Sequence, residues 1–283
     1  MASTRKLFAA LTRRGRHQVL RGDLAFAGLP GIVYTPATGF NLPGVAFGHD
    51  WLTDVDHYVK TLEHLASWGI VAAAPDTERG LAPSVLNLAF DLGTTLDIIT
   101  GVRLGPGQIS VHPTKLGLAG HGFGGSAAVF AAAGLSGAGA SAPKAVAALF
   151  PTVTKPPTQQ PAASLKVPGL VLSAPDDAQS LRTDALDLAA TWKGSALRIV
   201  SKAESAGLAE KRRFAGVLGL PASDRGTQKT ARALLTGFLL FHLTGDKDYR
   251  EFADPEAVLP KTEVLDPEAP PVTPEERLVA LLK

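Results

Sequence analysis

The sequence predicts an α/β fold, in which a doubly wound, mostly parallel β-sheet carries helices on both faces. Short apolar runs that fit buried strands alternate along the chain with longer segments of helical periodicity. One of these runs passes through a glycine-rich turn directly into a helix, as strands of parallel sheets often do. The 283 residues are also enough to bury the core of one large domain of this class.

Each strand is predicted where a short run of mostly apolar residues lies between turn-forming residues. In chain order the expected strands are residues 31–35, 44–48, 70–74, 115–119, 145–150, 169–173 and 196–200. Helices are predicted where apolar residues recur every three or four positions, as Tyr58, Leu62 and Leu65 do. They cover residues 55–68, 86–102, 126–133 and 227–243.

Both ends of the chain differ from this body, which we place at residues 21–255. Residues 1–20 are basic and carry Leu7 and Leu11 at helical spacing. This segment could lie as an amphipathic helix on an anionic membrane surface, although packing of the two leucines on the body is the simpler interpretation. Residues 256–283 form a Pro-rich tail, in which Thr273 and Pro274 are typical of a helix start. The short helix that follows could strap its own domain, the simpler interpretation, or dock on a protein partner.

Composition excludes several classes of function. Lys and Arg number 28 against 26 Asp and Glu, so the overall charge does not favour nucleic acid as a partner. The absence of cysteine excludes disulfides, thiolate catalysis and cysteine metal sites. His49, His57 and His64 lack the spacing of a compact metal-ligand set, and no ribose-binding acid follows the glycine turn. We therefore expect neither a metal nor a cofactor.

The sequence also bears on where the protein lies in the cell. No run approaches the roughly 20 continuous apolar residues that a membrane span requires. The first apolar run is short and is followed by arginines, which does not fit a signal peptide. We therefore predict a cytoplasmic protein, with a peripheral position at the inner face of the membrane as the alternative.

The glycine turn is the most informative stretch. Residues 120–125 read Gly-His-Gly-Phe-Gly-Gly and lie between a predicted strand and a predicted helix. This is the setting of the nucleophile elbow G-x-S-x-G, in which a serine is exposed on a sharp turn. The centre of the motif is here Gly122. Because glycine has no side chain, the covalent mechanism cannot start from this position.

Several other segments match one family in the same order. They are Gly48-His49-Asp50, residues 65–71 (L-A-S-W-G-I-V), Pro75-Asp76-Thr77, residues 167–172 (V-P-G-L-V-L) and Gly245 to Tyr249 (G-D-K-D-Y). With the glycine turn they resemble an α/β-hydrolase, closest to bacterial cutinases and polyester hydrolases and further from dienelactone hydrolases and chlorophyllases. The resemblance spans roughly residues 20–255 and implies the α/β-hydrolase fold.

The resemblance also implies where a catalytic triad would lie. The nucleophile position is Gly122, the acid position is Asp177 and the base position is Ser205. No histidine occurs between His121 and His242, so two of the three catalytic groups are missing. Asp177 could equally be a loop residue that caps the next helix.

The same comparison implies the other residues of the cleft. His49 corresponds to the side that forms the oxyanion hole and is expected to face the turn. The candidate lining residues are Asp50, Trp51 and Phe123, around a floor left open by the missing serine side chain. His121 is expected to pack beneath the turn as a structural residue.

These expectations favour a catalytically inactive hydrolase homologue that acts in binding, scaffolding or regulation. Its partner would be a protein, an anionic membrane surface or a hydrophobic ligand. One alternative is an active esterase with relocated residues around His49 and Asp50, or with Ser205 in an unexpected arrangement. It requires His49 within hydrogen-bond reach of a carboxylate in an open cleft. The other alternative is a carrier of a hydrophobic ligand.

Overall fold

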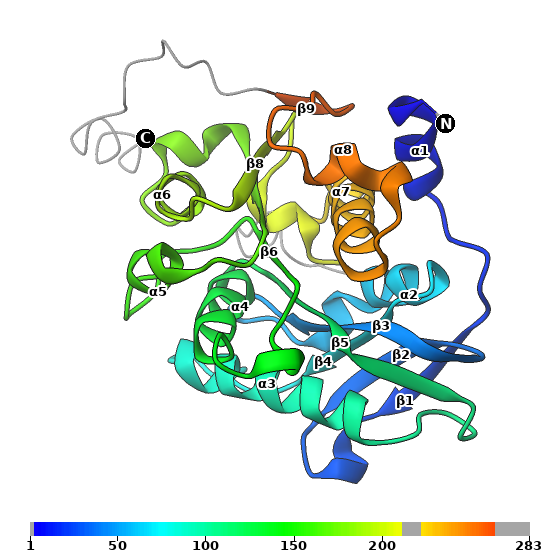
Figure 1. Cartoon of the computed structure of the whole chain (residues 1–283). Coiled ribbons are helices and arrows are strands. Elements are labelled where there is room, and N and C mark those ends of the chain that lie inside the picture. The colour runs from blue at the N-terminus through cyan, green and yellow to red at the C-terminus, as the bar shows by residue number, and fades with distance from the viewer. Residues whose placement is uncertain (1–2, 211–221, 264–283) are drawn as a thin grey trace.

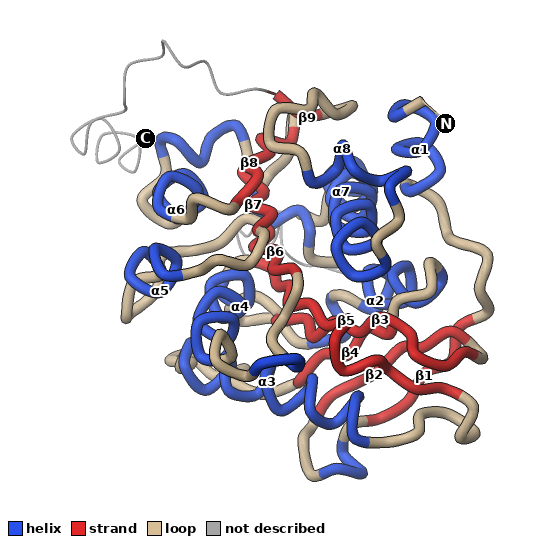
Figure 2. The backbone as a smooth tube through the Cα atoms, viewed as in Figure 1, coloured by secondary structure: helices blue, strands red, loops and turns tan. Residues whose placement is uncertain are grey.

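A computed structural model describes residues 3–210 and 222–263 of the chain. These residues contain a nine-stranded sheet with the order β1-β2-β4-β3-β5-β6-β7-β8-β9. The strands are β1 (Val19–Asp23), β2 (Gly31–Pro36), β3 (Gly39–Gly48), β4 (Val71–Pro75), β5 (Ile109–His121), β6 (Ala145–Leu149), β7 (Gly169–Ser173), β8 (Ser195–Val200) and β9 (Thr262–Glu263). Figure 2 shows them as one continuous, twisted band through the middle of the molecule.

Most of the sheet is parallel. The strands from β4 through β3 to β8 all run the same way, whereas β2 is antiparallel to both of its neighbours, β1 and β4. At the other edge β9 pairs antiparallel with the end of β8. The expected α/β fold with a mostly parallel sheet is confirmed.

Helices cover both faces of the sheet. They are α1 (Thr4–Leu11), α2 (Val59–Ser67), α3 (Val85–Gly101), α4 (Phe123–Gly134), α5 (Gln159–Ser164), α6 (Ala185–Thr191), α7 (Arg225–Thr244) and α8 (Arg250–Ala253). Helices α3 to α6 lie on one face, and α1, α2, α7 and α8 lie on the other (Figure 1). Successive buried residues of β4 alternate between the two cores: Val71 packs towards α3 and Ala72 towards α2.

The structure contains elements that the apolar patterns did not predict. The edge strand β1 is half exposed and its sequence has no apolar alternation. It is a strand because it pairs with β2, and this pairing is not visible in its own sequence. Helix α5 begins inside a Pro-rich loop, where the buried carboxylate of Asp184 accepts hydrogen bonds from Thr158 and Gln159. Such support from a residue distant in sequence is invisible to local patterns. Helix α6 was expected only as the helix after Asp177, without bounds, and strand β9 was not predicted.

The N-terminal segment packs on the body. Phe8 and Leu11 of α1 are buried against the core that contains α7, and Leu7 is partly buried there. The apolar side of α1 therefore faces the protein and is not free to enter a membrane. None of the described helices is both long and apolar enough to cross a bilayer. The helix expected within residues 274–282 lies outside the described residues.

Candidate functional site

The predicted elbow has the expected geometry. Strand β5 ends at His121 and α4 begins at Phe123, with Gly122 between them at φ 52° and ψ −117°. The Gly122 N–H donates to the carbonyl oxygen of Leu149 on the neighbouring strand (2.9 Å). A residue with a side chain would be strained at these angles, so the turn favours glycine. The hydrogen bond to Leu149 holds the turn against the neighbouring strand.

The first turn of α4 lies directly on the end of β3. A Cβ placed on Gly124 would be 2.2 Å from the carbonyl carbon of Gly48, so only glycine permits this approach. The close contact brings the loop after β3 to the N-terminal end of α4. The side chain from this loop that reaches the elbow is Asp50.

The carboxylate of Asp50 occupies the place of the missing side chain. Its Oδ1 accepts a hydrogen bond from the backbone N–H of Phe123 (2.9 Å). A Cβ built on Gly122 would be 2.0 Å from the same oxygen. The open floor expected beneath Gly122 is therefore absent, because Asp50 fills it.

This contact has an electrostatic consequence. The free N–H groups at a helix N-terminus carry partial positive charge and favour an anion. In a hydrolase elbow, the N–H of the residue after the nucleophile donates to the oxyanion of the intermediate. Here the corresponding N–H, that of Phe123, already donates to an internal carboxylate. A substrate oxyanion would have to displace Asp50 to reach it.

His49 lies in a different position from the one expected. Its side chain is 1% exposed, and its Nδ1 and Nε2 contact the carbonyl oxygens of Asp50 (2.9 Å) and Thr77 (2.7 Å). No carboxylate is among these hydrogen-bond partners. The ring thus connects the loops that follow β3 and β4, and the arrangement required by a His49-based esterase is not formed.

His121 is buried at the end of β5, directly before the turn. Its Nε2 lies 2.8 Å from the carbonyl oxygen of Ser205 and its Nδ1 lies 2.8 Å from the hydroxyl of Tyr58. A carbonyl only accepts, so Nε2 donates, and in the neutral imidazole Nδ1 then accepts from Tyr58. The Tyr58 oxygen in turn accepts from the Asp50 N–H (3.1 Å). Tyr58 was predicted only as an apolar position of its helix, and its hydroxyl now connects the elbow to the Asp50 loop.

Asp177 and Ser205 lie together. Asp177 belongs to a 3-10 turn (Pro175–Gln179) after β7, and Ser205 begins another (Ser205–Leu208) after β8. The Ser205 hydroxyl donates to Oδ1 of Asp177 (2.8 Å). Oδ2 accepts from the Ala174 N–H (2.7 Å) and the Ser173 hydroxyl (3.0 Å). The carboxylate thus points back to the end of β7 and to Ser205, and none of these donors belongs to the following helix α6.

The burial of Asp177 matters for its charge. Removal from water raises the pKa of this carboxyl, while the hydrogen bonds from Ala174, Ser205 and Ser173 oppose the rise. In a serine hydrolase such a carboxylate orients and stabilises a histidine. Ser205 is no substitute, because a neutral hydroxyl cannot take a proton from a nucleophile at neutral pH.

The remaining candidates do not form a common lining. Trp51 is 49% exposed, and its indole N–H donates to the carbonyl oxygen of Leu81 (3.2 Å). Phe123 is buried and packs in the core on the α3 face of the sheet. In the described part of the chain, no group of three His, Cys, Asp or Glu side chains is arranged to hold a metal ion.

Comparison with known proteins adds no assignment. No protein-family model matches the chain, and no curated protein is significantly similar to it in sequence. We therefore infer the function from the geometry of the elbow and its neighbours.

Proposed function

We propose that this protein is a catalytically inactive member of the α/β-hydrolase fold that serves as a binding or scaffold protein. The family assignment is supported by the strand order, by the antiparallel β2, and by the glycine elbow between β5 and α4. It is also supported by the chain order of Gly122, Asp177 and Ser205 and by the hydrogen bond between the last two.

One observation argues most directly against catalysis. The Asp50 carboxylate lies where the side chain of a nucleophile would be, and it accepts a hydrogen bond from the Phe123 N–H. Three requirements of acyl transfer fail together. Gly122 supplies no nucleophile, no base lies beside Asp177 among the residues that the structure describes, and the elbow N–H already donates to Asp50. Because triad residues act as a unit, the loss of any one already costs several orders of magnitude in rate.

Binding at the outer surface fits this site better than a ligand carried inside it. The elbow is filled by Asp50, whereas large apolar side chains on the surrounding loops face solvent. These exposed residues are Trp51, Leu52, Leu81, Val153 and Leu181. The loops that carry them follow the C-terminal ends of β3, β4, β6 and β7. This is the edge of the sheet at which α/β proteins commonly bind their ligands. The proposed partner is therefore another macromolecule that covers this apolar surface.

Hydrolysis of p-nitrophenyl acetate and butyrate tests the proposal. The wild-type protein is expected to hydrolyse both esters at the buffer rate. A rebuilt variant, Gly122→Ser with Asp50→Gly and Ser205→His, is expected to exceed the wild type by about 100-fold or more, since the orienting acid Asp177 is already in place. Gly122→Ser with Ser205→His alone is the matched control, and it should stay near background because Asp50 still blocks the elbow.

The control for the acid is the rebuilt variant with Asp177→Asn, which should lose most of the gained rate. A wild-type rate clearly above background that disappears in Asp50→Ala would contradict the proposal. It would instead assign chemistry to the carboxylate at the elbow.

A further inference from the structure

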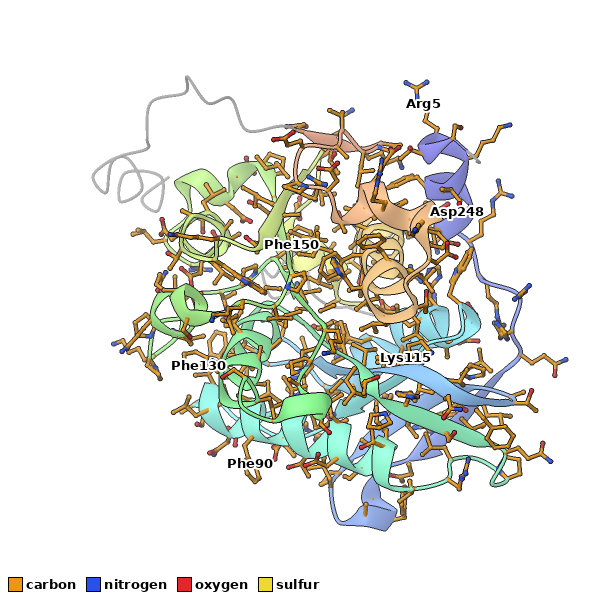
Figure 3. The ribbon with its side chains drawn as sticks, viewed as in Figure 1. Arg5, Phe90, Lys115, Phe130, Phe150 and Asp248 are labelled. Atoms are coloured by element: carbon orange, nitrogen blue, oxygen red, sulfur yellow. The ribbon has the colours of Figure 1, made fainter. Side chains whose placement is uncertain are left out.

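The N-terminal edge of the parallel sheet carries a row of lysines. The pairing of β5 with β6, of β6 with β7 and of β7 with β8 begins at or next to four residues that follow one another across the sheet: Gly117, Ala145, Gly169 and Ser195. One lysine lies one to three residues before each of them, and in the same order these are Lys115, Lys144, Lys166 and Lys193. Figure 3 labels the first of them, Lys115, on β5. Neighbouring strands are about 4.8 Å apart, so this lysine row extends over about 15 Å.

The lysine row is not neutralised by salt bridges within the described residues. Residues 98–175 include three of the four lysines and contain no Asp or Glu, although basic and acidic residues are almost equal in number in the whole chain. None of the four lysine side chains forms a salt bridge or a hydrogen bond with another described residue. Helices α4, α5 and α6 end before β6, β7 and β8, so their last carbonyls lie at the same edge. Each helix end carries only about half a negative charge, so a net positive charge remains.

A pocket of about 470 Å³ lies within the lysine row. Lys144 and Lys166 line it together with two serines and six apolar residues, and none of its described lining residues is acidic. The two largest apolar lining residues are Leu165, which is buried, and Val167, which is partly buried. The pocket therefore combines two positive charges with an apolar wall.

The two serines do not add donors to this pocket. The Ser136 hydroxyl donates to the carbonyl oxygen of Ala133 (2.8 Å), and the Ser164 hydroxyl donates to that of Pro161 (2.7 Å). A hydroxyl has only one proton to donate. The side-chain donors left for a ligand are therefore the two ammonium groups.

These groups select a small anion that also has an apolar part. A phosphate monoester carries a charge of about −1.5 to −2 at neutral pH and three acceptor oxygens, so it can contact both ammonium groups. A carboxylate has a single charge and matches one lysine. The volume of the pocket is within the range of small-molecule sites. We propose that the pocket binds a phosphate monoester, with its phosphate between Lys144 and Lys166 and its apolar substituent against Leu165 and Val167.

The rest of the row strengthens the attraction without lining the pocket. Lys115 belongs to β5, which is next to β6, and Lys193 precedes β8, which is next to β7. Charges one strand away act within the Debye length of about 8 Å at physiological salt. The pocket lies at the opposite edge of the sheet from the elbow, which follows the C-terminal end of β5. Binding here does not depend on whether the elbow is catalytic.

Isothermal titration calorimetry with butyl phosphate at low salt tests the site. The wild type is expected to bind this ester with a Kd of about 1 mM or lower. Inorganic phosphate lacks the apolar part, so it should bind at least about 5-fold more weakly. Addition of about 300 mM NaCl should weaken the binding of butyl phosphate several-fold, because the lysines are exposed and their charges are screened.

Two variants test the charges and the pocket separately. Lys144→Gln with Lys166→Gln should weaken the binding of butyl phosphate by at least about 30-fold. Ser136→Trp fills the pocket without changing its charge, and it should weaken binding by about 10-fold or more. Lys155→Gln is the matched control and should leave the affinity unchanged. Lys155 belongs to the same stretch without acids but follows β6, at the other edge of the sheet. All four side chains are exposed, so circular dichroism should report intact folds.

Vesicles distinguish two sources of the phosphate group. If the ligand is a soluble ester, vesicles of phosphatidylcholine with about one fifth phosphatidic acid should not sediment the protein. Sedimentation that butyl phosphate abolishes, and that is lost in the double glutamine variant, would assign the same pocket to a lipid head group.

Three outcomes would overturn the phosphate site. The first is a wild type that does not bind butyl phosphate at concentrations up to about 10 mM. The second is binding that the double glutamine variant or Ser136→Trp retains at the wild-type affinity. The third is an equal loss of affinity in Lys155→Gln, which would mean that the ester responds to the overall charge and not to the pocket.

Discussion

Gly122→Ala is expected to lower the free energy of unfolding by about 4 kcal/mol, one of the two largest effects we predict. Two costs add. A side chain at φ 52° and ψ −117° carries backbone strain of about 1–3 kcal/mol. The new Cβ would also lie 2.0 Å from Oδ1 of Asp50, which forces the carboxylate away from the Phe123 N–H.

The second cost arises from the contact with Asp50, so it can be measured separately from the backbone strain. The three atoms nearest the Cβ built on Gly122 are Oδ1, Cγ and Oδ2 of Asp50, and Asp50→Ala removes all of them. In that background Gly122→Ala should cost only the strain, about 2 kcal/mol. A double-mutant cycle measured by urea unfolding should therefore give a coupling of about 2 kcal/mol between the two positions.

Gly28→Ala is the matched control for this cycle. Gly28 also has positive φ, 84°, but a Cβ there would meet no atom within 4 Å. Its cost should be about 1 kcal/mol and should not change with Asp50→Ala. If Gly122→Ala costs the same with and without Asp50, the carboxylate does not fill the elbow, and the proposal of an inactive site is contradicted.

The contact between Gly122 and Asp50 also limits which residues position 122 can accept. With Asp50 in the elbow, a serine at position 122 is excluded by contact with the carboxylate as well as by strain. Restoring the nucleophile therefore requires a second change at Asp50. This mutual exclusion makes the glycine a structural requirement of the present protein and not only a missing catalytic group.

Much of the fold could be predicted because its signals are local. The predicted apolar runs overlap all the parallel strands from β3 to β8, although β3 and β5 begin five and six residues before the predicted starts at 44 and 115. Helix α7 (Arg225–Thr244) was predicted within two residues at its start and one at its end. The strand order was not available from such signals, because it depends on crossovers. β1 and α5 depend on a neighbouring strand and on the distant Asp184, so no local pattern contains them.

The candidate site divides in the same way. The elbow could be predicted, because its glycines and its strand and helix are contiguous in the chain. The loop after β3 was harder, since adjacent residues at the end of a strand point to opposite sides. The resemblance placed both His49 and Asp50 in the cleft beside the elbow. In the structure the Asp50 carboxylate reaches the elbow, and His49 is buried between carbonyl oxygens. The sequence did contain a signal for this arrangement, because Asp50 is an acidic residue in a loop expected beside Gly122, which has no side chain.

Acid sensitivity centred on His64 is the second large effect that we predict. His64 lies on α2, is buried, and its Nε2 has no hydrogen-bond partner among the described residues. Burial, with a smaller contribution from the positive charge of Arg232, lowers its pKa to about 3, although a hydrogen bond with the Leu11 backbone opposes the shift. An unfolded histidine has a pKa of 6.5.

The sign of the effect follows from proton binding. Between pH 6.5 and about 3 the unfolded chain holds a proton at His64 that the native protein does not hold. Stability is therefore fully present above pH 6.5 and falls as the pH is lowered, by up to about 1.4 kcal/mol per pH unit. The expected loss is about 2 kcal/mol at pH 5 and more than 4 kcal/mol across the whole window.

His64→Leu should remove this loss, because leucine does not titrate and leaves no unpaired nitrogen in the core. Urea unfolding at about pH 7.5 and about pH 5 should show a pH difference about 2 kcal/mol smaller for the variant than for the wild type. The buried carboxyls of Asp177, Asp184 and Glu210 have raised pKa values, so they stabilise the fold as the pH falls. Their contribution has the opposite sign, but it is present in both proteins and cancels in the comparison. Equal pH differences would mean that His64 is protonated in the native state and that α1 and α2 open to water around it.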